Sequence, residues 1–292
     1  MDYSIANFLL RTEGPHDDIK ACGLLGFKPF EVEYDSNAEP TMLLRMDSAI
    51  DESAYATTKV IHSFEFEQNY ATGELARYAT GYRFKMVRED RVFILVKEDG
   101  SNIVESNLGH FEEADPSLVR FGIWIMFGII IAPLGAIAIH SSVVVKNDEG
   151  VLCLGESGTG KSTHTRLWRE NIEGARLLND DSPIIRMIDG KCIVFGSPWS
   201  GKTACFVNKC VPVRALMRLS QAPYNKIHRL PALAAIGAVL PSCPPAFAYY
   251  NALQDHICNT VSDIISCTPI YHLECLPDAA AAELSYSTIF SA

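Results

Sequence analysis

The segment GESGTGKST, residues 155–163, combines residue types and spacings that point directly to phosphate chemistry. It matches the pattern G-x-x-x-x-G-K-[ST] of a phosphate-binding loop. Its glycines permit positive φ, so that successive N–H groups can point inward and surround an anion. Lys161 can reach the β- and γ-phosphates of ATP, and the Ser162 hydroxyl can bind Mg²⁺. We therefore expect ATP to be held by Gly155, Glu156, Ser157, Gly158, Thr159, Gly160, Lys161, Ser162 and Thr163.

The residues on either side of this segment have the order that a phosphate-binding loop requires. The preceding residues 150–155, GVLCLG, form a short apolar run that ends at a glycine. The following residues 161–171, KSTHTRLWREN, contain no glycine or proline and place Leu167 and Trp168 on one helix face. Strand, loop and helix are thus predicted in order, and the helix dipole would favour an anion. The alternative is a glycine-rich loop with an accidental lysine, which the flanking segments argue against.

Two adjacent carboxylates follow the expected helix. A nucleotide site needs a carboxylate that positions Mg²⁺ or polarises the nucleophile. Asp180 and Asp181 end a short apolar segment, and a crossover from the phosphate-binding loop could bring the chain back at this point. The alternative is a simple turn, because NDDSP, residues 179–183, also has good turn composition. In the presence of the loop we favour the functional interpretation.

His140 lies at the end of an apolar run. A single histidine in that position is more often a core residue than a catalyst. It precedes a strand, however, that should pair with the strand of the phosphate-binding loop. His140 could therefore face the same site.

A second segment, GSPWSGKT at residues 196–203, satisfies the same pattern. It lacks the middle glycine and carries Pro198 and Trp199 where the backbone should curl around phosphates. The residues after it alternate like a strand, so no helix N-terminus would face an anion. We expect a loop at the rim of the first site, with Trp199 and Lys202 available to a substrate. A chance match with no role is the alternative.

The composition argues against several classes of partner. The 292 residues carry a formal net charge of −10 without a basic stripe, so we do not expect nucleic acid as a main partner. The first residues lack the basic and apolar regions of a signal peptide. The nine cysteines are odd in number and none has C-x-x-C spacing, which favours free thiols over disulfides or a cysteine-ligated zinc ion. We expect a cytoplasmic protein.

Residues 121–139 form an apolar run without a charged residue, near the length of a membrane span. Pro133 and Gly135 interrupt it. We therefore expect a buried helix that starts near Pro116 with Asp115 as N-cap, followed by a buried strand, and no membrane partner. A membrane-spanning helix is the alternative.

The chain divides into two parts with different patterns. Residues 1–114 are β-rich, with candidate strands at 30–35, 41–46, 82–87 and 91–99 and a turn at 97–102. Residues 115–292 alternate strands and helices. In this second part we expect strands at 136–146, 150–155 and 211–221, hairpin turns at 146–150 and 189–190, and helices at 231–242, 246–266 and 279–290. The fold class is α/β, a mixed sheet with flanking helices preceded by a β-rich part.

Taken together, IHSSVVV, GVLCLGESGTGKST and LLNDDSPIIR resemble the catalytic domain of HPr kinase/phosphorylase. The loop also resembles that of ATP-dependent phosphoenolpyruvate carboxykinase, which shares the fold. Residues 196–203 and LECLPD, residues 273–278, are similar to segments of HPr kinase-related bacterial proteins of unassigned substrate. The resemblance covers about residues 135–277 and implies a P-loop kinase domain of the HPr kinase type.

The resemblance also implies roles for individual residues. Lys161 would hold phosphates, and Asp180 would act as general base on the acceptor hydroxyl. Ser162 and Asp181 would lie at the Mg²⁺ ion, and His140 would support the site. The metal-binding glutamate and the arginine-bearing loop of that family have no recognisable counterpart here. Because of these departures, the resemblance does not identify HPr as the substrate.

We therefore expect an ATP- and Mg²⁺-dependent kinase. It would transfer the γ-phosphoryl group to a hydroxyl, either a serine of a protein or peptide or a small molecule. The alternative is a non-catalytic nucleotide-binding sensor. Self-association into a homo-oligomer stays open.

Overall fold

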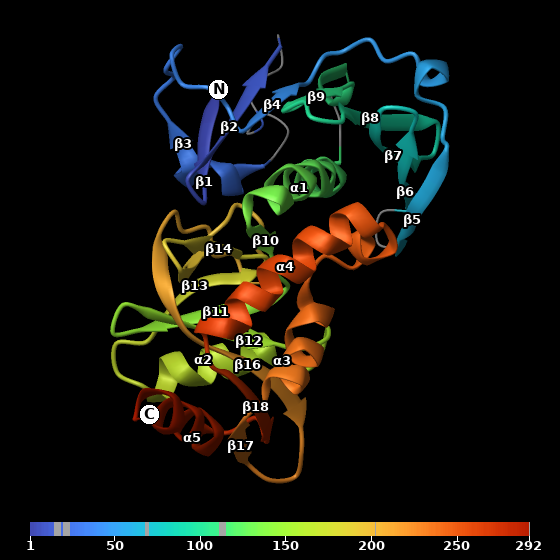
Figure 1. Ribbon diagram of the computed structural model, residues 1–292. Coiled ribbons are helices and arrows are strands. Elements are labelled where there is room, and N and C mark those ends of the chain that lie inside the picture. The colour runs from blue at the N-terminus through green and yellow to red at the C-terminus, as the bar shows by residue number, and fades with distance from the viewer. Residues whose placement is uncertain (15–18, 20–23, 68–69, 111–114, 202, 292) are drawn as a thin grey trace. The chain divides into compact units, whose positions relative to one another are not determined.

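The computed structural model describes residues 1–292 except 15–18, 20–23, 68–69, 111–114, 202 and 292. The chain forms two compact units (Figure 1). The first contains Met1–Pro133 and Ala246–Leu253, and the second contains Leu134–Pro245 and Gln254–Ala292. The predicted boundary after residue 114 therefore differs from the structure, in which the following helix belongs to the first unit.

The first unit is built on a nine-stranded sheet with the order β3-β1-β2-β4-β9-β8-β7-β6-β5. Its strands are β1 (Asp2–Ile5), β2 (Phe8–Glu13), β3 (Glu31–Val32), β4 (Met42–Arg45), β5 (Lys59–Phe66), β6 (Ala71–Tyr78), β7 (Gly81–Arg88), β8 (Arg91–Glu98) and β9 (Ile103–Ser106). The 3-10 helices η1 (Leu25–Phe30), η2 (Glu52–Tyr55) and η4 (Leu108–His110) accompany them. The predicted strand at 30–35 shrinks to the two residues of β3, whereas those at 82–87 and 91–99 are β7 and β8.

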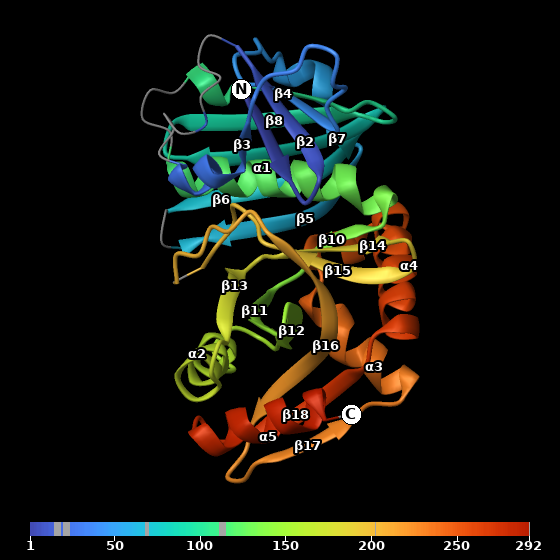
Figure 2. The ribbon, with the colours of Figure 1, turned by 90° about the vertical axis from the view of Figure 1, so that its left-hand side faces the viewer.

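Helix α1 (Pro116–Ile131) packs against the sheet of the first unit (Figure 2). It begins as predicted, because the Asp115 carboxylate accepts a hydrogen bond from the Ser117 N–H and Pro116 occupies the first turn. A Cβ at Gly122 would lie 2.9 Å from Leu95 and 3.1 Å from Met86, so a glycine permits this close approach to the strands. This packing places α1 in the first unit.

Among the described residues, one helix, Pro116–Leu134, is long and apolar enough to cross a membrane. It includes the short 3-10 helix η5 (Ala132–Leu134). In the structure 67% of its most apolar window is buried, as in the core helix of a globular protein.

The second unit contains a mixed nine-stranded sheet, and the protein as a whole is a mixed α/β fold with large sheets and few helices. The sheet order is β10-β14-β15-β16-β12-β11-β13, with β18 beside β16 and β17 beside β18. Its strands are β10 (Ala136–Ala138), β11 (Ser141–Lys146), β12 (Glu149–Leu154), β13 (Arg176–Asp181), β14 (Ile184–Ile188), β15 (Lys191–Phe195), β16 (Cys210–Gln221), β17 (Lys226–Arg229) and β18 (Ile270–Cys275).

The helices of the second unit lie close to the predicted positions. They are α2 (Lys161–Asn171), α3 (Ala232–Val239), α4 (Asn251–Cys267) and α5 (Ala279–Phe290), with η6 (Leu240–Ser242) and η7 (Pro245–Tyr249) as 3-10 turns. The predicted helix at 246–266 is divided into η7 and α4, and α4 begins with the last residues of the first unit. The predicted hairpin turns are present, with positive φ at Asn147, Asp148 and Asp189.

The expected strand at 136–146 is interrupted. The chain leaves the ladder after β10 and resumes with β11, and His140 lies in the gap, where its N–H donates to the Ser242 carbonyl at 2.7 Å. The strand expected after residue 203 is absent, because the described residues 203–209 form neither helix nor strand. Alternation in the sequence was therefore not sufficient, because a strand also requires a partner strand with which to pair.

Helices α2 and α5 pack together over β12, β16 and β18 and enclose the core of the second unit. A buried polar cluster joins the two helices. The Trp168 Nε1–H donates to His164 Nε2 at 3.1 Å and to the Ser285 hydroxyl at 2.9 Å. Because His164 Nε2 accepts this bond, its imidazole is neutral, and burial lowers the pKa of His164 to about 4.

We expect this cluster to make stability depend on pH. His164 in the unfolded chain takes up a proton below its ordinary pKa, whereas the folded side chain stays neutral down to about pH 4. Its contribution is present above pH 6.5 and is lost as the pH falls, by about 2 kcal/mol between pH 7 and 5. Urea denaturation of the wild type and of His164→Gln at both pH values measures it. An identical pH dependence in the two proteins would contradict this assignment, since other histidines contribute equally to both.

Candidate phosphate-binding site

The loop between β12 and α2 has the backbone conformation that the sequence predicted. Gly155, Gly158 and Gly160 have φ angles of 150°, 82° and 107°, which a side chain would strain. Gly160 is the N-cap of α2, so the loop leads directly into the helix N-terminus. The loop is closed on itself, because the N–H and hydroxyl groups of Thr159 both donate to the Glu156 carbonyl.

Lys161 is a buried cation at the start of this helix. Its Nζ donates to the carbonyls of Gly155 at 2.8 Å and Glu156 at 3.1 Å, and only 8% of the residue is exposed. Burial lowers its pKa, and the nearby Asp181 and Asp180 carboxylates oppose this effect. Within the described part of the chain Lys161 has no carboxylate within ion-pair distance. A buried ammonium held only by carbonyl groups is an incomplete environment that an anion would complete.

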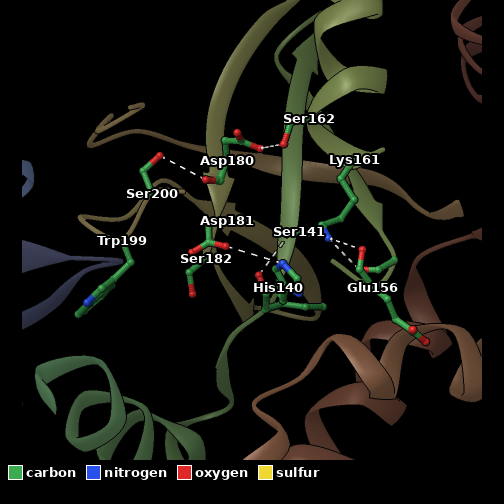
Figure 3. Close-up of polar contacts among 12 residues, drawn as sticks. His140, Ser141, Glu156, Lys161, Ser162, Asp180, Asp181, Ser182, Trp199 and Ser200 are labelled. Carbon is green, nitrogen blue, oxygen red and sulfur yellow. Dashed lines mark hydrogen bonds and ion pairs between the residues drawn. The ribbon is translucent and has the colours of Figure 1, made fainter. Parts of the chain in front are cut away.

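The Ser162 hydroxyl donates to Asp180 Oδ1 at 2.8 Å (Figure 3). The two residues meet because β12 and β13 both pair antiparallel with β11, so the end of β13 lies one strand away from the phosphate-binding loop. Asp180 is only 4% exposed, and its backbone carbonyl accepts a hydrogen bond from the Gly201 N–H at 2.5 Å. The predicted crossover therefore brings this carboxylate beside the loop.

Asp181 and His140 form the more open side of the site. Their closest atoms, Asp181 Oδ1 and His140 Nε2, are 3.7 Å apart, and 45% of each side chain is exposed. The φ angle of Asp181 is 143°, a strained conformation for a residue with a side chain. Burial and then the Lys161 charge lower the pKa of His140, whereas Asp181 and Asp180 oppose the shift. At neutral pH the histidine is therefore uncharged and can accept or donate a hydrogen bond.

These side chains line one cavity of about 350 Å³. Its walls are the phosphate-binding loop with the first residues of α2, together with His140, Asp180, Asp181 and Gly201. A second cavity of about 540 Å³ adjoins it and shares Gly158, Gly160 and Thr163 with it. The second cavity is walled by α2 and by the residues at the ends of β16 and β18, and its surface is mainly apolar. The charged cavity and the apolar cavity thus adjoin each other at Gly158 and Gly160.

The second glycine segment contributes Gly201 to the lining of the cavity, but its glycines have a different function from those of the first segment. A Cβ at Gly196 would lie 1.9 Å from the Val207 carbonyl oxygen, and one at Gly201 would lie 3.1 Å from the Asp180 carbonyl oxygen. Neither glycine has positive φ. They permit close backbone packing and do not form an anion nest.

The structure does not support the expectation that Trp199 is available to a substrate. Trp199 is only 3% exposed, and its side chain points away from Lys161 and Ser162 (Figure 3). Its ring is therefore buried and is not presented to a substrate. Lys202 lies outside the described residues.

Asn179 is a residue whose role the sequence did not reveal. It is fully buried, and its Nδ2 lies 3.2–3.3 Å from the Ser197 carbonyl, the Ser197 hydroxyl and the Trp199 carbonyl. Its Oδ1 accepts from the Ser182 N–H at 3.0 Å. Asn179 thereby fastens the loop at 196–201 to the end of β13, next to Asp180. Its only sequence signal was its place beside the two aspartates.

Comparisons with known proteins yield little. No protein-family model matches the chain, and no curated protein does so. One solved structure that matches is the HPr(Ser) kinase/phosphatase from Coxiella burnetii, with 13% sequence identity and a TM-score of 0.31, over 52% of this chain and 93% of that chain. This is a distant likeness that says nothing about individual residues or activity.

We expect Asn179→Leu to release the loop at 196–201. The substitution keeps the volume but leaves buried carbonyl groups without donors, which costs about 1–3 kcal/mol. Hydrogen exchange followed by mass spectrometry should show faster exchange at residues 196–201, while peptides from β7 and β8 stay unchanged as an internal control. Unchanged exchange at 196–201 would mean that Asn179 does not hold the loop.

Proposed function

We propose that the protein is an ATP- and Mg²⁺-dependent kinase that transfers a phosphoryl group to a hydroxyl. The observation that supports this most strongly is Lys161, a buried cation without an ion pair in the described part of the chain. It lines a cavity at the N-terminus of α2. The helix dipole and the glycine conformations favour an anion at the same point. The anion that fits is a polyphosphate, because a single charge would not require so extended a loop.

A divalent cation fits the same cavity for an electrostatic reason. Asp180 and Asp181 both face the space that phosphates would occupy and would repel them. Oxygen ligands are what Mg²⁺ prefers, and it is usually bound by one or two carboxylates together with phosphate oxygens. Ser162 and Asp180, which already share a hydrogen bond, would hold the ion. When bound, Mg²⁺ neutralises charge on the phosphates.

The larger, apolar cavity would receive the nucleoside. It adjoins the phosphate cavity at Gly158 and Gly160, so a base bound there remains connected to phosphates at Lys161. Leu167 and Leu219 offer apolar contacts in this cavity. Gln221 also lines it, and its Nε2 donates to the Gly158 carbonyl at 3.3 Å. Ligand cavities of this size, largely apolar with a few polar groups, are typical of small-molecule sites.

The geometry supports a division of roles between the aspartates that differs from the one the resemblance implies. Asp180 is buried and accepts the hydrogen bond from Ser162, so we assign it to the metal side. Asp181 is half exposed beside the neutral His140 and is open to an incoming hydroxyl, so we assign the general base to Asp181, positioned by His140.

Nucleotide binding should depend on Lys161. Mg²⁺ and ATP should raise the melting temperature of the wild type, because the ligand binds only the folded state. Lys161→Ala should remove most of this shift, with ATP affinity at least tenfold weaker. Lys191→Ala, an exposed lysine at the hairpin of β14 and β15, is the matched control, and Lys202→Ala tests the second glycine segment. If Lys202→Ala weakened ATP binding more than Lys161→Ala, the nucleotide site would have to be assigned to residues 196–203 instead.

The two aspartates should separate metal binding from transfer. Asp181→Asn should keep ATP affinity within a few-fold and reduce the transfer rate about a hundredfold, because a general base contributes about that factor. Asp180→Asn should instead raise the Mg²⁺ concentration that half-saturates the reaction. The transfer rate of each variant, and its dependence on Mg²⁺ concentration, are measured with γ-labelled ATP and an acceptor found by labelling a cell lysate.

The outcome of the labelling experiment also distinguishes classes of protein. A labelled acceptor supports the kinase. Release of free phosphate without a labelled acceptor indicates an ATPase, and ATP binding with neither product indicates a nucleotide-binding sensor. If Asp180→Asn abolishes transfer at saturating Mg²⁺ while Asp181→Asn transfers normally, the assignment of the base is reversed.

A further inference from the structure

Two histidines and a glutamate lie together on one face of the paired strands β17 and β18. The strands are antiparallel, and His228 on β17 lies directly opposite His272 on β18. Glu274 follows His272 by two residues, so its side chain points to the same face of the sheet. The opposite face carries Ile227 and Leu273, which belong to or pack against the core of the second unit. Strand pairing and core packing thus fix the positions from which the three polar side chains extend.

The distances among these side chains are close to those of a metal site. One potential ligand atom from each of the three residues lies within 4.8 Å of the others. The imidazole centroids are 5.4 Å apart with an interplanar angle of 72°, so the rings do not stack. In a tetrahedral zinc site, bonds of about 2.0–2.2 Å place neighbouring ligand atoms about 3.4 Å apart. Closing this difference requires rotation of the exposed His228 side chain and of Glu274.

Neighbouring hydroxyls hold two of the three side chains in place. His272 Nε2 and the Ser220 hydroxyl lie 2.8 Å apart, and the Tyr224 hydroxyl donates to Glu274 Oε1 at 3.0 Å. Ser220 lies on β16, the strand on the other side of β18, directly opposite Glu274. In metal sites a hydrogen bond at one ring nitrogen commonly orients a histidine whose other nitrogen binds the ion. Ser220 supplies such a bond, and Tyr224 supplies its counterpart for the carboxylate.

Two positive charges share this face of the sheet. Arg218 lies opposite His272 on β16, and Lys226 lies opposite Glu274 on β17. Arg218 is directed to the Ala238 carbonyl and to Glu156, each at 3.4 Å. Both charges oppose a cation and disfavour ions that bind by charge alone, such as Mg²⁺ or Ca²⁺. Two imidazoles with one carboxylate instead suit zinc, which accepts nitrogen ligands readily.

We propose that His228, His272 and Glu274 bind a Zn²⁺ ion that joins β17 to β18. Three protein ligands leave the fourth position of a tetrahedral ion to water or another small ligand. This site is separate from the proposed nucleotide site, since Cys275, the next residue of β18, lines the larger cavity from the other face of the sheet. The zinc site therefore goes beyond the proposed kinase function and does not depend on it.

The test uses zinc alone, without nucleotide. Protein treated with a chelator and then dialysed is titrated with ZnCl₂ by calorimetry, and the retained metal is counted by elemental analysis. We expect one zinc ion per chain and a higher melting temperature with zinc. His228→Gln and Glu274→Gln should each weaken zinc binding at least tenfold and lose the temperature shift. Lys226→Gln, which removes a positive charge from the same face, is the matched control and should bind zinc as tightly as the wild type or more tightly.

Clear outcomes would overturn the proposal. Absence of stoichiometric zinc binding by the wild type would do so. Zinc binding by both ligand variants with wild-type affinity would also do so, because it would assign the metal to other groups, such as the exposed Cys258. His228 is exposed at the edge of the sheet, so its substitution should not prevent folding, and far-UV circular dichroism checks this for each variant.

Discussion

The second unit depends on a buried positive charge that no carboxylate of the described residues approaches to ion-pair distance. Lys161 begins α2, and only 8% of the residue is exposed. The carbonyls of Gly155 and Glu156 hold its ammonium group, and they can do so only because positive φ at the glycines turns the loop back toward the helix. Burial of an unpaired charge costs free energy, which the rest of the fold must offset. A polyphosphate would supply the missing counter-charge, so this cost is the physical basis of the proposed affinity.

The strand order explains why the carboxylates meet this charge. Strand β11 lies between β12 and β13, so the chain can leave β12, form α2 and return one strand away with the same direction. Asp180 then reaches Ser162, and the break between β10 and β11 places His140 near Asp181. The strain at Asp181 is tolerated because backbone pairing on both sides holds it, by Ser141 in β11 and by Ser200 in the loop. The site is therefore a consequence of topology as much as of local sequence.

Several local structures in both units follow from rules that need only the neighbouring residues of the sequence. Glycines in a fixed pattern, an Asp115 N-cap, and turn residues at Asn147 and Asp189 specify conformations without reference to the rest of the chain. The sequence did not predict the domain boundary. Helix α1 belongs to the first unit because it packs on strands of that unit, and this close packing requires the glycine at position 122. It also did not reveal Asn179 or the His228 and His272 pair, since these depend on which strands and loops become neighbours.

The two segments that match the same phosphate pattern show where a pattern stops being informative. In residues 155–163 the glycines take positive φ and a helix follows, so the backbone N–H groups and the dipole act at one point. In residues 196–203 the glycines permit contact with Val207 and Asp180, and irregular chain follows. The same residue type is required in both, once for its conformational freedom and once for its lack of a side chain. The second segment nevertheless forms part of the phosphate-binding site. Gly201 allows the loop at 196–201 to lie against Asp180, and Gly201 lines the cavity.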